Sequence, residues 1–327
     1  MKAAVLTADS IEIRDVPRPV PTADQVLVRV RASGLNRADL IMYSGHKHGN
    51  TGGPGTILGL EWAGEIVETG NAVEGFKAGD RVMCSGMGGY AEYAVADWGR
   101  ISLVPTNNMS WEQAATMPVA LQTMHNAIVT NGRLQPGETV MIQGASTGVG
   151  LMGMQIAKFK GALQVIGTST NAMRRERLAE FGADLALDTQ DPGWVDAALA
   201  ATSGKGVDLI IDQISASVAN QNLKAAAVRG RIVNVGRLGG NKGEFDFDLH
   251  AMKRIDYIGV TFRTRSVEEV REINRRMRAD LWPAVEAGAL KLPIDRAFPL
   301  DDAAAALAHM KANAHFGKIV LMGSSTG

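Results

Sequence analysis

Residues 139–150 read TVMIQGASTGVG, and this stretch decides the fold class of the chain. An apolar run ends at Gly144, and Gly148 and Gly150 follow closely before a helical pattern begins. Glycines at such places let main chain lie where a side chain would not fit. In a dinucleotide site, a turn of this kind rests phosphate groups on the free N–H groups of the helix start. The stretch therefore predicts the first strand, turn and helix of a dinucleotide-binding domain.

The spacing of these glycines leaves an alternative open. Gly144 and Gly148 lie four residues apart, which departs from the plain G-x-G-x-x-G pattern. A turn of this sort can also be a tight strand-to-helix connection with no ligand. The context favours a cofactor site, because the turn opens a series of alternating strands and helices.

Downstream of the turn, short apolar runs alternate with helical segments. The apolar runs are LQVIGTS (163–169), LALD (185–188), VDLIIDQIS (207–215), RIVNVG (231–236) and DYIGVTF (256–262). Buried strands separated by helices are typical of a parallel sheet. The pattern predicts an α/β fold with a Rossmann-like, doubly wound parallel sheet.

The first 110 residues follow a different pattern. QVLVRVRASGLN (25–36) alternates apolar and polar residues, as a half-buried strand does, and further short strand patterns follow it. These residues predict a mainly antiparallel, barrel-like module. From Ser110 to Gly132 the spacing becomes helical, and Ser110 with Gln113 forms a capping-box pattern at the start of that helix.

Composition and charge exclude several classes of protein. The chain has 327 residues and a net charge of zero, so it lacks the basic surplus of a nucleic-acid-binding or membrane-surface protein. No apolar run approaches the roughly 20 residues of a membrane helix. A single cysteine, Cys84, permits neither an internal disulfide nor a thiolate cluster for zinc. We therefore expect a cytoplasmic protein without nucleic-acid or membrane partners.

The end of the second strand of the α/β part indicates the cofactor. An NAD enzyme usually carries an acidic residue here for the ribose hydroxyls. This chain instead has Thr168, Ser169 and Thr170, followed by Arg174 and Arg175. Small hydroxyls and a guanidinium suit a 2′-phosphate, so we expect NADPH, bound in part by Ser169 and Arg174. Exposed arginines at an ordinary helix start are the alternative.

Several motifs together resemble one family, the zeta-crystallin-like, zinc-independent quinone oxidoreductases of the medium-chain dehydrogenase/reductase superfamily. They include GLNRADL (34–40), ILGLEWAGEIVETG (57–70), the glycine turn and VGRLGG (235–240). The C-terminal segments GVTFRTRSVEE, LWPAVEAGAL, IDRAFPLDDAAAA and FGKIVL are similar to the branch that contains the p53-inducible quinone reductase. The resemblance covers essentially the whole chain.

The resemblance implies a fold and an assembly. It implies a GroES-like catalytic domain over residues 1–120, a Rossmann NADPH-binding domain over 121–260, and a segment, 261–327, that returns to the catalytic domain. It also implies a homodimer joined through the Rossmann sheets.

Zinc ligands are missing where the alcohol dehydrogenases have them. Those enzymes place Cys where Asn36 stands and a His-Glu pair where Leu60 and Glu61 stand. His46 and His48 are close in sequence, but their spacing indicates a loop. We therefore expect no metal, and hydride delivery to an acceptor that is already electron-poor.

The resemblance also assigns roles to residues of the catalytic and cofactor sites. It implies that Asn36 donates a hydrogen bond to the acceptor carbonyl, and that Thr123 lies near the nicotinamide carboxamide. It further implies that Thr147, Gly148 and Val149 hold the pyrophosphate together with Gly144. A strand-end role for Asn36 and a helix-interior role for Thr123 are the structural alternatives.

Other residues are expected around the nicotinamide and the acceptor. The resemblance implies that Gly236, Phe262 and Arg263 wall the pocket, although Arg263 is alternatively a surface residue. Lys47 stands where several relatives carry a tyrosine, so we assign Tyr43 and Lys47 to the substrate pocket.

A second departure lies after the third Rossmann strand. Relatives often have Asn-Tyr there, whereas this chain has Asp188 and Thr189. This difference weakens the expectation of NADPH.

These observations favour an NADPH-dependent reductase of quinones that works without zinc. An enone reductase, which saturates an activated C=C bond, is the alternative within enzymes. An NADPH-binding protein with little turnover is the alternative outside them.

Overall fold

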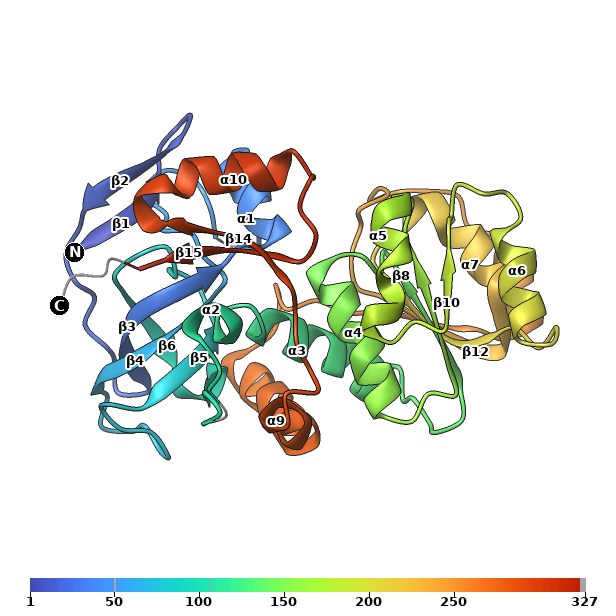
Figure 1. The fold of residues 1–327 in the computed structure, drawn as a ribbon, viewed down its shortest axis with the longest axis horizontal. Helices are drawn as coiled ribbons and strands as arrows, with labels where there is room; N and C mark the ends of the chain where they lie inside the picture. Colours follow the sequence, from blue (N-terminus) through green and yellow to red (C-terminus); the bar gives the residue numbers. More distant parts are fainter. Residues whose placement is uncertain (50, 107, 324–327) are drawn as a thin grey trace. The chain divides into compact units, whose positions relative to one another are not determined.

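The computed structural model describes residues 1–49, 51–106 and 108–323. The chain forms two compact units (Figure 1). Met1–Val119 and the described residues from Phe262 onward form the first, which we call the barrel unit. Ala120–Thr261 forms the second, which we call the Rossmann unit. Each unit therefore contains one of the two strand patterns found in the sequence.

The barrel unit is built on a seven-stranded, mainly antiparallel sheet. Its order is β14-β15-β3-β4-β5-β7, and β6 pairs with β3 off this path. The strands are β3 (Gln25–Gly34), β4 (Glu61–Thr69), β5 (Arg81–Ser85), β6 (Tyr93–Asp97), β7 (Ile101–Leu103), β14 (Ile294–Pro299) and β15 (Lys318–Met322). A separate hairpin consists of β1 (Lys2–Leu6) and β2 (Ile11–Asp15). The C-terminal β15 pairs with β3, so distant parts of the sequence share one sheet.

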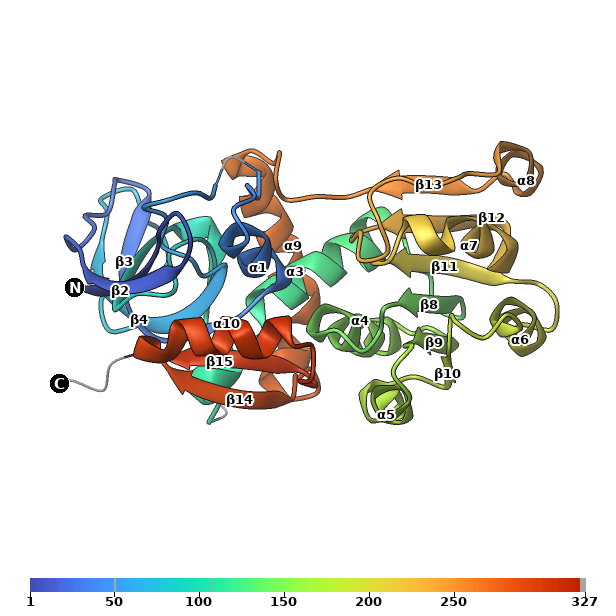
Figure 2. The same cartoon turned by 90° about the horizontal axis from the view of Figure 1, so that it is seen from above.

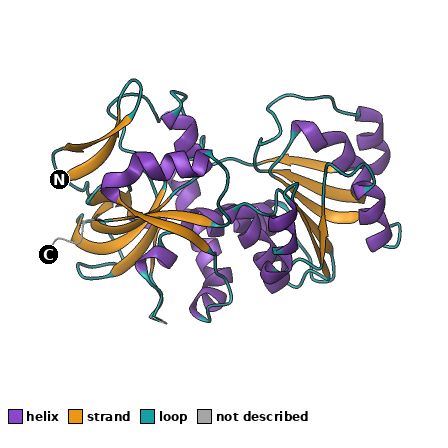
Figure 3. Ribbon diagram, turned by 45° about the horizontal axis from the view of Figure 1, so that its top comes forward, coloured by secondary structure: helices purple, strands orange, loops and turns teal. Residues whose placement is uncertain are grey.

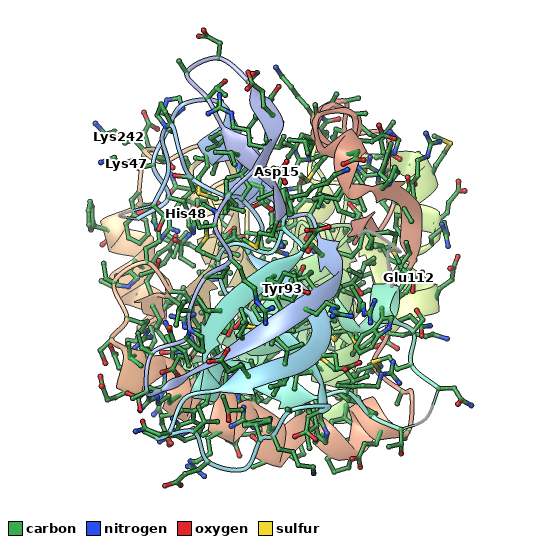
Figure 4. The ribbon with its side chains drawn as sticks, turned by 90° about the vertical axis from the view of Figure 1, so that its left-hand side faces the viewer. Asp15, Lys47, His48, Tyr93, Glu112 and Lys242 are labelled. Carbon is green, nitrogen blue, oxygen red and sulfur yellow. The ribbon has the colours of Figure 1, made fainter. Side chains whose placement is uncertain are left out.

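Strand β3 is more deeply buried than its alternating pattern predicts. Val26, Leu27 and Val28 are all buried, and the alternation holds only further along the strand. Arg29 is partly exposed, and its guanidinium and that of Arg18 lie over the ring of Tyr93 on β6. Figure 4 labels Tyr93. The strands β4 and β6 pair with the two edges of β3. The side chains of Val26 and Val28 pack in a buried cluster with residues of β4, β5 and β6.

Four α-helices accompany this sheet in the described part of the barrel unit. They are α1 (Arg37–Tyr43), α2 (Trp111–Ala114), α9 (Val267–Glu286) and α10 (Ala303–Lys311). Helix α10 packs on β15 and on α1, and Leu307 and Met310 on α10 join the core that contains Leu321 of β15. The C-terminal segment therefore contributes a strand and a helix to the core of this unit.

The helical pattern that begins at Ser110 is divided in the structure. The expected capping box between Ser110 and Gln113 is present at the start of α2. Helix α2 ends at Ala114, and α3 (Pro118–His125) begins anew at Pro118. Proline has no N–H, and its ring clashes with the carbonyl four residues earlier, so the helix stops there. A π-helical turn over Asn126–Asn131 then replaces the last part of the expected helix.

The Rossmann unit contains a six-stranded parallel sheet in the order β10-β9-β8-β11-β12-β13 (Figure 2). The strands are β8 (Thr139–Gln143), β9 (Gln164–Thr168), β10 (Leu185–Leu187), β11 (Val207–Asp212), β12 (Ala226–Asn234) and β13 (Asp256–Gly259). The strand order reverses between β8 and β11, and dinucleotides bind at such a switch point in open parallel sheets. The predicted doubly wound sheet is confirmed.

Helices cover both faces of this sheet (Figures 1 and 3). They are α4 (Gly148–Phe159), α5 (Ala172–Glu176), α6 (Trp194–Ala201), α7 (Ala219–Ala225) and α8 (Phe247–Lys253). Helix α4 packs on β8 and β9, whereas α7 and α8 pack on β12. The helical segment expected between the apolar runs 163–169 and 185–188 is divided, because α5 ends at Glu176 and a 3-10 turn over Leu178–Phe181 follows it.

Among the described residues, none of the helices combines the length and the apolar character needed to cross a lipid bilayer.

Candidate functional site

The turn after β8 brings main chain close to main chain. Gly144 has a φ of +71°, in the left-handed region that favours glycine. A Cβ atom added at Gly150 would lie 2.6 Å from the carbonyl oxygen of Gly144 and 2.7 Å from Cα of Ala145. No side chain fits at Gly150, so the start of α4 packs directly against the end of β8.

Thr147 closes this turn. Its Oγ1 accepts a hydrogen bond from the N–H of Gly150 at 2.9 Å, which caps α4. The same hydroxyl can donate to the carbonyl of Gly144 at 3.1 Å or to Oε1 of Gln213 at 3.0 Å. The first N–H groups of a helix have no intrahelical acceptor, and those of Gly148 and Val149 are the first two of α4. Gly144, Thr147, Gly148 and Val149 therefore lie in one turn at the start of α4, with the N–H groups of Gly148 and Val149 at the helix end where anions are favoured.

Gln213 links the strand ends at the switch point, and the sequence analysis missed it. It follows β11, and its Nε2 donates to the carbonyls of Gln143 and Gly144 at 3.1 and 3.3 Å. Gly236, after β12, lies against it: a Cβ at Gly236 would be 2.7 Å from the carbonyl oxygen of Gln213. Gln213 thus joins the ends of β8, β11 and β12. Its place directly after a buried strand was the sequence signal that could have identified it as a site residue.

The hydroxyl residues after β9 have different roles. Thr168 is buried, and its hydroxyl links the ends of β8 and β9. It donates to Oε1 of Gln143 at 2.8 Å and accepts from the N–H of Gly144 at 3.0 Å. Ser169 donates to the hydroxyl of Ser146 in the glycine turn at 3.0 Å. Of the predicted ribose hydroxyls, Thr168 is therefore used internally, whereas Ser169 lies beside the turn.

Two arginines follow Ser169 on α5, and both are partly exposed. Arg175 donates through Nη1 to the carbonyl of Ser169 at 2.8 Å and to Oδ2 of Asp188 at 2.9 Å. Arg175, which was not among the predicted site residues, is therefore tied to the end of β9. Asp188, which stands in the place of the family's asparagine, brings a negative charge to the same strand ends.

Thr123 stands out on a buried helix. It is partly exposed, whereas every other residue from Leu121 to Ile128 is buried. A Cβ at Gly153 would lie 2.9 Å from Sδ of Met124, so α3 packs closely on α4. The side chain of Thr123 is thus the accessible polar group of this stretch.

In the barrel unit, Asn36 lies directly before α1 and is hydrogen-bonded to two buried charged residues. Its Nδ2 donates to Oε1 of Glu61 at 3.0 Å and makes a longer contact of 3.4 Å with the carbonyl of Gly34. Its Oδ1 accepts from Nζ of Lys318 at 3.1 Å. Lys318 also donates to Glu61 and, at 2.8 Å, to the carbonyl of Leu35. The sequence analysis named Glu61 only as a missing-ligand position and did not find Lys318.

A buried carboxyl group supports the same helix start. Asp39 accepts hydrogen bonds from the N–H of Asn36 at 2.8 Å and from the hydroxyl of Tyr90 at 3.1 Å. Burial raises the pKa of Asp39 to about 7, against the lowering effects of these donors, the Gly59 N–H and the charge of Lys318. The pKa of Tyr90 is also raised, chiefly by burial.

The predicted substrate residues lie on two segments of the barrel unit. Tyr43 ends α1 and packs against the core, whereas Lys47 is exposed on the following loop. A Cβ at Gly49 would lie 3.5 Å from Cβ of Arg263, so the loop of Lys47 runs beside Arg263. Burial and then the charge of Arg263 lower the pKa of His48, which Figure 4 labels beside Lys47. Phe262 is partly buried in the same segment as Arg263.

Within the described residues, no group of three or more His, Cys, Asp or Glu side chains could hold a metal ion. The thiol of Cys84 is buried in β5, and burial raises its pKa well above the usual range. Thiolate chemistry at Cys84 is thereby disfavoured.

Two family models match the chain. Residues 22–106 match the alcohol dehydrogenase GroES-like domain, and residues 148–278 match the zinc-binding dehydrogenase domain. A GroES-like domain combined with a parallel Rossmann sheet defines the medium-chain dehydrogenase/reductase superfamily, as the sequence motifs predicted.

Curated relatives identify the family within this superfamily. Quinone oxidoreductase of Rattus norvegicus is 30% identical over 94% of this chain and 92% of its own length. The Mus musculus enzyme of that name is 32% identical over 89% and 87%, respectively. The chain therefore belongs to the quinone oxidoreductase family. It is also 29% identical to a phenolphthiocerol/phthiocerol polyketide synthase subunit of Mycobacterium tuberculosis, matching 96% of this chain but spanning only 14% of that subunit.

Solved structures share the fold over nearly the full chain. A quinone oxidoreductase of Pseudomonas syringae pv. Tomato is 25% identical, with a TM-score of 0.85 over 98% of this chain and 100% of that one. An NAD-dependent alcohol dehydrogenase is 28% identical, with a TM-score of 0.86 over 98% and 99%.

The raised pKa of Asp39 makes a prediction about stability. Its pKa is higher in the folded chain than the ordinary 3.8, so folding favours the protonated carboxyl. The stability from this proton is complete at low pH and is lost as pH rises through about 7. Relative to the variant Asp39→Asn, the wild type should lose about 2 kcal/mol of unfolding free energy between roughly pH 5 and pH 8. Urea denaturation at both pH values measures this. A difference between wild type and variant that stays constant with pH would contradict it.

Proposed function

We propose that this chain is an NADPH-dependent reductase that transfers hydride to quinones without zinc. The observation that carries the proposal is the turn from Gly144 to Gly150, where main chain and the start of α4 form a cradle at the switch point of the sheet. Membership of the quinone oxidoreductase family supports the same assignment.

The residues of the Rossmann unit fit a dinucleotide. The N–H groups of Gly148 and Val149 would hold the pyrophosphate, and the capping hydroxyl of Thr147 keeps α4 in place behind them. The hydroxyls of Ser169 and Ser146 and the side chain of Arg174 would hold the ribose and its 2′-phosphate. Bound in this way, the cofactor supplies the hydride, and the chain supplies position and charge.

Asn36 would act on the acceptor. One N–H of its Nδ2 donates to Oε1 of Glu61 at 3.0 Å. The second N–H makes the long contact of 3.4 Å with the carbonyl of Gly34. An acceptor oxygen that lies along this second N–H can replace the long contact, and the N–H then stabilises the negative charge that develops on that oxygen on reduction. Such a donor replaces the charge stabilisation that zinc would otherwise give. Phe262 and Tyr43 would border the acceptor, and Gly236 and Thr123 the nicotinamide.

An enone reductase is the second candidate. The observation that favours it is the exposed Lys47 beside Arg263, because cationic groups suit a substrate carbonyl better than a bare aromatic ring. Product analysis distinguishes the two candidates.

The homodimer and the location are also part of the proposal. Strand β13 forms an edge of the Rossmann sheet, and Phe245 lies 5.1 and 5.4 Å from the rings of Phe247 and Tyr257 beside it. Phe247 is exposed, and an open strand edge with exposed aromatics fits a second copy of this sheet. Sedimentation of a monomer at micromolar concentration would contradict the dimer. A single buried cysteine is consistent with the reducing cytoplasm.

We predict that the purified chain oxidises NADPH when quinones are added, and does so faster than with enones. An absorbance assay across ortho-quinones, para-quinones and enones, with NADPH and with NADH, measures this. Saturated ketone as the main product would identify an enone reductase instead. Tight binding of NADPH without turnover of any acceptor would identify a binding protein.

A second prediction concerns cofactor preference. Arg174→Ala should weaken NADPH binding by about tenfold and leave NADH binding nearly unchanged, because a charge-assisted phosphate contact is lost. Asp188→Asn should strengthen binding of NADPH alone, because a carboxylate at these strand ends no longer repels the 2′-phosphate. Calorimetric titration measures both dissociation constants without turnover. Equal effects on NADPH and NADH would contradict the 2′-phosphate role.

A further inference from the structure

A buried ion pair lies behind Asn36 in the barrel unit. Lys318 begins β15 and Glu61 begins β4, so the pair joins positions 257 residues apart in sequence. The side chain of Glu61 is fully buried, and that of Lys318 is 7% exposed. Burying two charges costs several kcal/mol per ion unless hydrogen bonds satisfy both of them. Each donor and acceptor atom of the pair therefore needs a hydrogen-bond partner.

Every proton of the Lys318 ammonium has an acceptor. An ammonium group has three protons and no lone pair. They meet Oε1 of Glu61, the carbonyl of Leu35 at 2.8 Å and Oδ1 of Asn36 at 3.1 Å. The other carboxylate oxygen of Glu61 accepts from the N–H of Val119 at 2.9 Å. The pair is thus satisfied only if Asn36 takes part.

Asn36 is the accessible member of this cluster. Among the three side chains of Asn36, Glu61 and Lys318, only that of Asn36 belongs to a residue that is partly exposed. A carboxamide has one acceptor end and one donor end. The ammonium can bind only the oxygen, and the carboxylate can bind only the nitrogen. The two charges therefore fix the amide in a single orientation, with Nδ2 as its donor.

The charge of Lys318 also changes the strength of that donor. A cation hydrogen-bonded to the amide oxygen polarises the amide and makes its N–H groups stronger donors, because linked hydrogen bonds polarise one another. Stabilisation by such a donor grows as negative charge develops on the acceptor, so it acts mainly in the transition state.

We propose that Lys318 is a positioning residue for the reduction: through Oδ1 it orients and polarises the carboxamide of Asn36 that donates to the acceptor oxygen. This inference rests on the proposed function, which assigns that donation to Asn36. Glu61 holds the ammonium of Lys318 in place and accepts a hydrogen bond from Nδ2 of the Asn36 amide.

The decisive variant removes both charges together. Lys318→Met alone would leave Glu61 buried without a counter-ion, which is strongly destabilising. In Lys318→Met/Glu61→Gln no charge is left unpaired, and the new amide can donate to Oδ1 of Asn36. The Asn36 amide would then turn over and lose its polarising cation.

We expect this double variant to fold and to bind NADPH as the wild type does. Its kcat for quinone reduction should fall by about 100-fold with little change in KM, the size of effect seen when an oxyanion donor is lost. Lys318→Arg should recover part of kcat, because a cation with several donors is retained. A kcat equal to that of the wild type in the double variant would overturn the proposal, since Lys318 would then serve only to neutralise Glu61.

A matched control lies in the Rossmann unit. Lys253 also donates through Nζ to main-chain carbonyls, those of Lys224 and Ala226, at the amino-terminal end of β12. Lys253→Met should leave kcat unchanged. A 100-fold loss in this control as well would overturn the specific role of Lys318.

A readout without turnover separates this inference from the proposed function. The side-chain amide signals of Asn36 in NMR spectra, assigned by their loss in Asn36→Asp, should shift in the double variant and return in Lys318→Arg. Unchanged signals in the double variant would overturn the positioning role even if the wild type reduced no acceptor. Absence of turnover with shifted signals would overturn only the proposed reaction.

Discussion

The close approach of main chain at Gly144 and Gly150 is the constraint on which the proposed cofactor site depends. With no side chain between them, helix α4 begins directly against the end of β8. Thr147 and Gln213 fix this arrangement with hydrogen bonds to the turn and to the neighbouring strand ends. The strand order places the turn at the switch point of the sheet, where the first N–H groups of α4 can hold phosphate oxygens.

The barrel unit depends on a second constraint, the burial of charge. Lys318 and Glu61 come from strands at opposite ends of the sequence, and β15 pairs with β3 next to them. Leaving either charge unpaired at this depth would cost free energy of folding. The pair therefore stabilises the position of β15 in the sheet that the N-terminal residues form. The same pair holds Asn36 at the start of α1, where Asp39 binds its N–H. Assembly of this unit and orientation of a polar side chain thus share one set of contacts.

Local sequence patterns were enough to predict the two kinds of sheet, but not where every helix ends. Alternating apolar runs and turn residues gave the parallel sheet, and Ser110 with Gln113 gave the start of α2. The pattern could not show that Pro118 would divide the following helix, because helical spacing continues on both sides of it. Gly144 and Thr147 were found together because one short turn contains both.

Contacts between distant residues could not be predicted in this way. Gln213 and Lys318 act through partners 66 and 257 residues away, and no local pattern marks such pairs. The sequence analysis named Arg174 for the 2′-phosphate, although nothing in the sequence distinguishes it from the neighbouring Arg175. Only the phase of α5 shows that Arg175 binds the carbonyl of Ser169 and Asp188. The contacts of these residues depend on burial and on helix phase, and both can be seen only in the folded chain.

The most direct test of the cofactor site is calorimetric titration of NADPH into Gly150→Ala. The added Cβ would meet the Gly144 carbonyl and push the start of α4 away from the turn. Gly259→Ala is the matched control, because a Cβ there would have no neighbour within 4 Å. We predict that Gly150→Ala, if it keeps the far-ultraviolet spectrum of the wild type, binds NADPH at least about tenfold more weakly, whereas the control binds normally. A folded Gly150→Ala variant with the affinity of the wild type would contradict it.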